Sequence, residues 1–186
     1  MNSYEKIEVV TTYLEMTRPP ADKESRHRLE KLAILRAHNP TISFYRYLYN
    51  TVGDKCLWYE RRLMSDDDLL DIIHDEKVSI YVLYVDGVPA GYAEFDRRID
   101  NDVELAYFGL IPEFIGRGLG SYLLDWSIRK AWSYDPQRVW VHTCTLDHPQ
   151  ALPTYQKLGF QPYKQETVTI DNPRLALVSS TQSKSE

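Results

Sequence analysis

LIPEFIGRGLGS, at residues 110–121, places three glycines at alternate positions between a strand-like segment and an amphipathic helix. Residues 103–110, which lead into it, are rich in β-formers and aromatic residues and predict a strand. Apolar residues then recur at the i, i+3, i+4, i+7 spacing of one helix face: Leu119, Tyr122, Leu123 and Trp126. Glycines let backbone N–H groups point into one concavity, and a helix N-terminus adds the positive end of its dipole. The stretch therefore predicts a site for a ligand that carries phosphates.

Three common nucleotide loops do not fit these glycines. A nucleoside triphosphate loop ends in Gly-Lys-Ser/Thr, whereas Gly120 is followed by Ser121 and Tyr122. A dinucleotide fingerprint needs a glycine three residues after Gly118, where Ser121 stands. A methyltransferase loop expects an acid two residues before its first glycine, where this chain has Phe114. A cofactor with a pyrophosphate and no required metal fits better, and coenzyme A is the commonest such molecule.

A second block, residues 138–160, supports coenzyme A. It has the pattern of a buried strand at 138–144 and a short helix at 149–158. Together the two blocks resemble the GNAT superfamily of acetyl-CoA-dependent N-acetyltransferases, specifically from residue 79 to residue 163. The family's acyl-CoA signature, Arg/Gln-x-x-Gly-x-Gly/Ala, spans Ile115 to Gly120. Its closing pattern of Asn-x-x-Ala, Tyr and Gly-Phe is matched by His148, Ala151, Tyr155 and Gly159-Phe160.

The resemblance implies which residues bind acetyl-CoA. They are Leu110, Ile111, Ile115, Gly116, Arg117, Gly118, Leu119, Gly120, Ser121 and His148. Ile115 stands where the family usually has Arg or Gln, so one side-chain contact to phosphate is missing. His148 replaces the usual Asn, a residue that often touches the pantetheine arm. Because backbone amides do most of the binding, the site is expected to remain, with Arg117 as the basic residue placed to meet phosphate.

The resemblance also implies the catalytic groups. Family members leave a gap between two parallel strands for the pantetheine, and the N–H near Leu110 would bond the acetyl carbonyl. Tyr155 matches the family's general acid toward the sulfur. Glu104 matches the general base of the histone-acetylating members, and strand alternation is expected to put it on the same face as Leu110. Glu94 is the second candidate base, and if it lies across from Glu104 one of the two carboxyl pKa values should rise.

Each candidate also has a structural interpretation. Tyr155 would pack under Gly159-Phe160, and Glu104 would be a solvated acid at a strand edge. Cys144 is expected to be a small core residue rather than a nucleophile. Its neighbours His142, Asp147 and His148 fit no zinc spacing, so we expect no metal, and strand alternation would bury His142 together with Cys144. Two charged pairs, Arg61-Arg62 and Arg97-Arg98, are expected to be solvated.

Bulk composition sets the class of protein. The 186 residues suit one domain with a single core, and 43% hydrophobic with 26% charged residues is ordinary for a soluble protein. A net charge of −5 argues against nucleic-acid binding. Two cysteines make no disulfide framework, the N-terminus shows no signal peptide, and the apolar runs are too short for a bilayer. We therefore expect a reduced, cytoplasmic setting without a membrane or nucleic-acid partner.

The elements along the chain predict a mixed sheet. Strands are expected at 6–16, 78–85, 88–97, 103–110, 138–144 and 165–170. Helices are expected at 42–52, 66–74, 118–134 and 149–158, and 25–38 suits either type. A crossover helix would join 103–110 to 138–144 as a parallel pair. The fold class is therefore α/β (mixed α+β): a mostly antiparallel sheet with one parallel pair, splayed as in the GNAT fold, flanked by helices. We expect one domain over 1–178 and a loose tail at 179–186.

The expected activity is direct transfer of acetyl from acetyl-CoA to a primary amine. The alternative is a non-catalytic acyl-CoA sensor or partner module of the same fold, which would need neither Tyr155 nor Glu104. The acceptor, a small molecule or a protein lysine, is not readable, and a homodimer is left open. Aromatic residues of the N-terminal half are expected to line the acceptor site: Tyr45, Tyr47, Tyr49 and Trp58.

Overall fold

The computed structural model describes residues 5–21 and 31–173 and contains one seven-stranded sheet, in the order β2-β3-β4-β5-β6-β1-β7. The strands are β1 (Lys6–Met16), β2 (Leu32–Ala37), β3 (Val78–Val85), β4 (Val88–Asp96), β5 (Asp102–Leu110), β6 (Arg138–Cys144) and β7 (Gln161–Asp171). Neighbouring strands run antiparallel except β5 and β6, which are parallel. The predicted fold class is confirmed.

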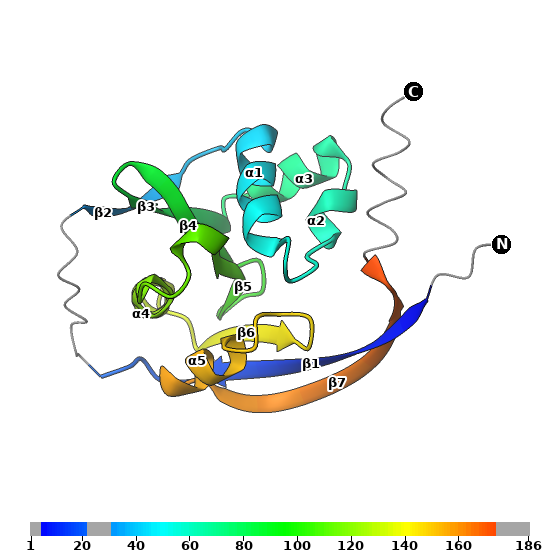
Figure 1. The fold of residues 1–186 in the computed structure, drawn as a ribbon. Helices are drawn as coiled ribbons and strands as arrows, with labels where there is room; N and C mark the ends of the chain where they lie inside the picture. Colours follow the sequence, from blue (N-terminus) through cyan, green and yellow to red (C-terminus); the bar gives the residue numbers. More distant parts are fainter. Residues whose placement is uncertain (1–4, 22–30, 174–186) are drawn as a thin grey trace, which may run out of the picture.

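Helices cover both faces of the sheet (Figure 1). One group comprises α1 (Ile42–Gly53), α2 (Glu60–Leu63) and α3 (Asp66–Ile73), and the other comprises α4 (Leu119–Trp132) and α5 (Ala151–Lys157). A short 3-10 helix, η1 (Pro112–Phe114), connects β5 to the glycine loop before α4. Within the described residues, no helix is both long and apolar enough to cross a membrane.

Each face of the sheet buries its own hydrophobic cluster. Helix α1 begins after the N-cap Thr41, whose side chain accepts a hydrogen bond from Phe44 N–H, and it buries Tyr45, Leu48 and Tyr49. Those three belong to a cluster that also takes residues from α3, β3 and β4. On the opposite face, α4 packs Leu124, Ile128 and Ala131 against β5 and β6, in a cluster that includes Val103, Leu105, Val139 and Val141. Side chains that alternate along β5 and β6 therefore point to different helical layers.

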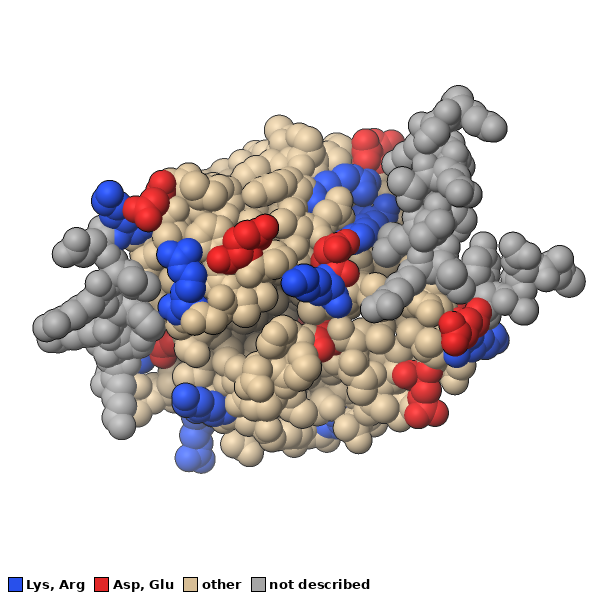
Figure 2. Space-filling view, viewed as in Figure 1, with Lys and Arg blue, Asp and Glu red and all other residues tan. Residues whose placement is uncertain are grey.

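The parallel pair separates after three residues. Asp102 to Glu104 pair with Arg138 to Trp140, and beyond Glu104 the two strands no longer pair with each other. Strand β6 instead pairs along its length with β1, while β5 stays with β4. The surface is hollowed between the α1–α3 layer and the part of the molecule formed by β6 and α5 (Figure 2). We call the space between the diverging ends of β5 and β6 the opening.

Element bounds differ from the predicted ones at several ends. Residues 32–37 of the ambiguous segment are a strand, while its residues 25–30, like the tail 179–186, lie outside the described residues. Strand β7 starts at Gln161, earlier than predicted, because a bulge at Tyr163 lets pairing with β1 continue. Helix α2 was not predicted. Pro153 falls at the third position of α5, where its missing N–H removes no helical hydrogen bond.

Candidate active site

The glycine loop has the backbone geometry of an anion site. Gly116 and Gly118 have φ of +83° and +77°, and Gly118 is the N-cap of α4. A Cβ built on Gly116 would meet nothing within 4 Å. The first turn that follows, Leu119–Tyr122, is uncharged, and its leading N–H groups have no helical carbonyl to bond. The loop therefore exposes positive backbone dipoles with room beside them, as the sequence predicted.

Two side chains of this loop differ in what they offer a phosphate. Ile115 is 45% exposed, so it does not belong to the core. Arg117 is held by a cation–π contact, with its guanidinium 5.2 Å from the centre of the Phe114 ring. The register assumed for the loop places Ile115 at the surface, in agreement with the structure. Arg117 remains the basic side chain closest in sequence to the first turn of α4.

A backbone donor points into the opening from β5. Ile111 N–H donates to Ala90 O of β4 at 2.9 Å. Because successive N–H groups of a strand point to opposite edges, the N–H of Leu110 points away from β4. That edge is the one from which β6 has separated. Leu110 therefore offers an N–H group at the position where the sequence predicted the donor to the acetyl carbonyl.

A bulge in β5 changes which side chains share a face. Leu105 pairs with Phe95 and Tyr107 with Glu94, so Ala106 is an extra residue. Before it, Leu105 faces α4; after it, Leu110 packs in the α4-side cluster with Leu119 and Leu123. Glu104 consequently points to the α1 side, and the expectation that it shares a face with Leu110 is wrong. A bulge inserts one residue and so reverses the alternation.

Tyr155 lies on the α4 side of the opening. It is 6% exposed, and its ring packs on Phe108 and Phe160 with centroids 6.2 and 5.8 Å apart. Burial, followed by the charges of Asp147 and Cys56, raises the pKa of Tyr155 and keeps its hydroxyl protonated. Within the described residues no hydrogen bond occupies that hydroxyl. Tyr155 thus has the packing expected of a core tyrosine, and its hydroxyl keeps its proton.

The side chains of Glu104 and His142 meet on the α1 side of the opening. His142 Nδ1 lies 3.3 Å from Glu104 Oε1. His142 was expected to be buried by strand alternation, but the buried residues of β6 are Val139, Val141 and Thr143, and His142 is exposed. The hydrogen bond with Glu104 is the main cause that raises the pKa of His142.

Glu94 is enclosed in a separate polar cluster. Its carboxylate is fully buried, accepts a hydrogen bond from Tyr45 Oη at 2.6 Å and pairs with Arg61 Nη2 at 2.9 Å. Its pKa is raised chiefly by burial. It lies opposite Tyr107, whereas Glu104 lies opposite Asp96, so the two candidate bases do not face each other. Arg61 was expected to be solvated. It is instead buried, because its position on helix α2 places its side chain against the buried Glu94.

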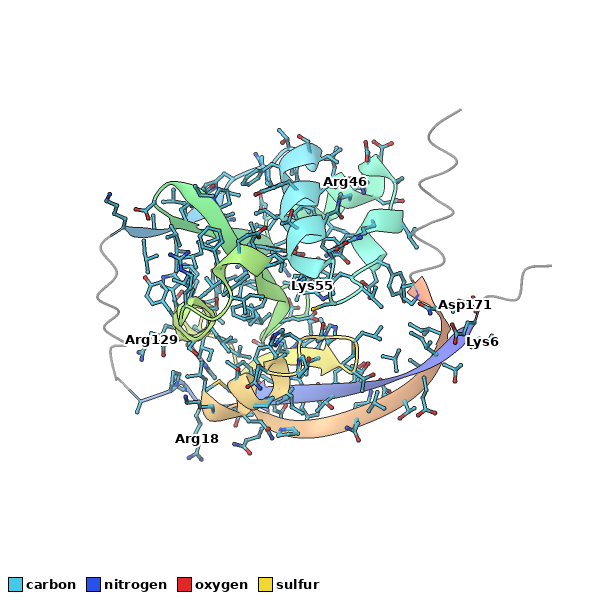
Figure 3. All side chains as sticks on the ribbon, in the orientation of Figure 1. Lys6, Arg18, Arg46, Lys55, Arg129 and Asp171 are labelled. Carbon is cyan, nitrogen blue, oxygen red and sulfur yellow. The ribbon has the colours of Figure 1, made fainter. Side chains whose placement is uncertain are left out.

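The loop after β6 is hydrogen-bonded to the segment that connects α1 to α2. Asp147 accepts hydrogen bonds from Trp58 Nε1 at 3.2 Å and from Thr143 Oγ1 at 2.8 Å. Lys55 in Figure 3 marks this connection, at the end of α1 and above β6. Both cysteines, Cys56 and Cys144, are free thiols whose pKa is raised mainly by burial. Among the described residues no cluster of His, Cys, Asp and Glu is arranged to hold a metal.

The aromatic residues expected to line an acceptor site have different positions. Tyr45 and Tyr49 are fully buried in the α1 core, and Tyr47 is 45% exposed. Trp58 is half-buried and packs on Tyr107, with ring centroids 5.1 Å apart. Trp58 is therefore the member of this set that lies at the α1 side of the opening, and Tyr107 joins it there. His148, the remaining predicted cofactor residue, is exposed just before α5.

Comparisons with known proteins agree with this geometry. The sequence model of the acetyltransferase (GNAT) family matches residues 44–160. Among solved structures, a GCN5-related N-acetyltransferase from Kribbella flavida is 16% identical, with a TM-score of 0.58 over 90% of this chain and 60% of that one. One from Sphaerobacter thermophilus is 13% identical, with a TM-score of 0.62 over 91% and 55%. No match was found among curated proteins.

A tandem GNAT protein from the clavulanic acid biosynthesis pathway is 15% identical, with a TM-score of 0.63 over 87% of this chain and 53% of that one. At these identities the likeness is one of fold. The chain spans between half and two thirds of the length of the solved structures named here.

Proposed function

The chain belongs to the acetyltransferase (GNAT) family, and from that premise we propose that it transfers acetyl from acetyl-CoA to a primary amine in a ternary complex. One observation carries the proposal. The Leu110 N–H group points into the opening, with Tyr155 on its α4 side and the pair of Glu104 and His142 on its α1 side. A backbone donor between an acidic and a basic side chain is the equipment that acyl transfer to an amine needs.

The residues of the glycine loop fit a pyrophosphate. Room beside Gly116, the N–H groups at the start of α4 and the guanidinium of Arg117 together favour an anion there. Acetyl-CoA supplies an activated acetyl thioester, which an amine attacks directly. We propose that Leu110, Ile111, Ile115 to Ser121 and His148 bind it, with the backbone contributing more than the side chains.

We assign each proton transfer to one group. The Leu110 N–H would donate to the carbonyl oxygen as negative charge develops there. Tyr155 would give its proton to the sulfur as the carbon–sulfur bond breaks, because the hydroxyl is protonated at neutral pH and the departing thiolate is basic. Glu104, rather than Glu94, is the carboxylate that supports removal of the amine proton. Glu94 has no exposed surface and both of its oxygens are engaged by Tyr45 and Arg61.

The amine acceptor is proposed by class alone, as a small-molecule amine or a protein lysine. The test is consumption of acetyl-CoA across a panel of amines that includes amino acids, polyamines, aminated antibiotics and whole proteins. Turnover with one class, lost in the Tyr155→Phe variant, is the expected result. Tight binding of acetyl-CoA without turnover on any amine would instead favour the acyl-CoA sensor.

A further inference from the structure

The pair of Glu104 and His142 lies where β5 and β6 part. Glu104 is the last residue of β5 that pairs with β6, and its partner is Trp140. His142 follows Trp140 by two residues on the same face of β6, and its Nδ1 reaches back to Glu104 Oε1 at 3.3 Å. The Glu104 side chain is 19% exposed and that of His142 is 44% exposed. An incoming molecule therefore meets the imidazole before the carboxylate.

His142 is also closer to the end of β5 where the acetyl group is expected. Glu104 pairs with Trp140, and His142 follows Trp140 by two residues along β6, which runs parallel to β5. Two residues of strand correspond to about 7 Å, so His142 lies that much nearer than Glu104 to the level of Leu110. A carboxylate at the level of Glu104 needs an intermediary to reach an amine beside the thioester. The imidazole of His142 occupies the intermediate position.

We propose that His142 is the general base of the transfer and that Glu104 is its positioning residue. This inference rests on the acetyl transfer proposed above. With Nδ1–H donating to Glu104, the Nε2 atom of His142 carries the lone pair and is free to accept a proton. A carboxylate that fixes the tautomer and orientation of a histidine, and that stabilises the imidazolium, is a recurrent device in catalytic and metal sites.

The proton balance is complete without another reactant. An ammonium nitrogen gives one proton to His142 Nε2, and the resulting amine attacks the thioester carbonyl carbon. The carbon–nitrogen bond forms, the carbon–sulfur bond breaks, and the sulfur takes the proton of Tyr155. The nitrogen then loses a second proton, and this proton restores the hydroxyl of the Tyr155 phenolate. His142 returns its proton to solvent, to which its side chain is open.

The surroundings of His142 set the pH range in which it works. Carboxylates of three elements act electrostatically on its imidazole: Glu104 of β5, Asp147 of the loop after β6 and Glu60 of α2. The rings of Tyr13 and Trp140 lie beside it, at 5.9 and 6.1 Å. The hydrogen bond with Glu104 and the three negative charges outweigh the opposing effect of burial and raise the pKa of His142 above its ordinary 6.5. Because only neutral imidazole accepts a proton, kcat should rise as pH increases through that raised value.

The test is the pH dependence of kcat, from pH 5 to 10, for four proteins with the amine identified by the screen. His142→Asn should lower kcat by about a hundredfold or more and abolish the titrating limb above pH 6.5, with KM for acetyl-CoA unchanged. Glu104→Gln should retain the limb but shift it to lower pH, since the imidazolium loses its main partner. The matched control is His38→Asn, the same substitution at an exposed histidine of the β2–α1 connection, and it should behave as wild type. Thermal melting checks that each variant folds.

Outcomes that overturn the inference are distinct from those that overturn acetyl transfer. If wild-type protein acetylates an amine and His142→Asn keeps both the rate and the limb, His142 is not the base and the acetyl transfer stands. If His142→Asn lowers the rate equally at every pH, the pair of Glu104 and His142 has only a structural role in holding β5 and β6 together, and His142 is not the base. If wild-type protein binds acetyl-CoA and acetylates nothing, the proposed function fails and this inference fails with it.

Discussion

Alanine at Gly120 should separate cofactor binding from fold stability. Gly120 lies in the first turn of α4, and the nearest heavy atom to a Cβ built there is Leu110 Cδ1, at 3.7 Å, an ordinary contact. Alanine is favoured over glycine within helices by up to about 1 kcal/mol, so Gly120→Ala should melt at or above the wild-type temperature. The added methyl group would stand on the surface where a pyrophosphate approaches the N–H groups of α4.

The size of the loss in affinity follows from the bond it removes. A hydrogen bond to a charged group contributes about 1.5–3 kcal/mol, and 1.4 kcal/mol is a tenfold change in binding. If the added methyl group prevents one hydrogen bond between an α4 N–H group and the pyrophosphate, acetyl-CoA binding should weaken by about 10- to 150-fold. Titration calorimetry with a chelator present measures the dissociation constant, and thermal melting of the same samples measures stability.

Two other glycines serve as controls for Gly120→Ala. Gly87, in the turn between β3 and β4, has φ of +83° and open space around it, so Gly87→Ala should cost about 1–2 kcal/mol of stability and leave acetyl-CoA binding unchanged. Gly116 has the same φ but lies in the glycine loop, so Gly116→Ala should reduce both the stability of the fold and the affinity for acetyl-CoA. If Gly120→Ala binds acetyl-CoA with wild-type affinity, the pyrophosphate does not lie on this loop and the reasoning is refuted. Preferential binding of ATP or S-adenosylmethionine would contradict the choice of cofactor.

Three further predictions concern side chains. Tyr155→Phe should lower kcat about a hundredfold with little change in acetyl-CoA affinity, and an unchanged rate would return Tyr155 to a packing role. Ile115→Arg adds a cation at an exposed position of the loop, so acetyl-CoA binding should tighten and become more sensitive to salt, while Arg117→Ala should weaken it; calorimetry at two salt concentrations measures both. Arg61→Met should destabilise the fold by about 3–5 kcal/mol in urea unfolding because it leaves the Glu94 carboxylate buried without its cation, and pairing it with Glu94→Gln should recover much of the loss. Equal destabilisation in the single and double variants would show that the ion pair is not the cause.

The sequence predicted most strands because their cues are local. Asp86 and Gly87 adopt the positive φ values that a two-residue hairpin turn requires, and Ser65 caps α3 through Asp68 N–H as its position suggested. The glycine loop was recognisable for the same reason, because its own glycines permit the backbone conformation that it adopts. Each of these features depends on neighbours within a few positions along the chain.

Features that depend on distant pairing were predicted less well. Arg61 carries no local sign that it will be buried, because its partner Glu94 comes from β4 and meets it only when α2 packs beside α1. His142 lies in a strand whose apolar residues fit burial on either face, and only the position of α4 decides that Val139 and Val141 are the inner ones. Strand alternation was therefore applied with the wrong face inward for His142, which the sequence predicted to be buried.

The bulge at Ala106 explains both why Glu104 and Leu110 do not share a face of β5 and why β5 and β6 separate. Pairing between β5 and β6 ends at Glu104, two residues before the extra residue, while pairing between β5 and β4 continues on both sides of it. A bulge bends its strand and increases the local twist, so the end of β5 turns with β4 and away from β6. The same insertion that reverses the faces of β5 thus accounts for the opening. Residues 105–110 are all apolar, aromatic or glycine, so the sequence is compatible with a regular strand in either register. The hydrophobic pattern therefore does not reveal Ala106 as the extra residue, although the bulge at Ala106 shapes the site.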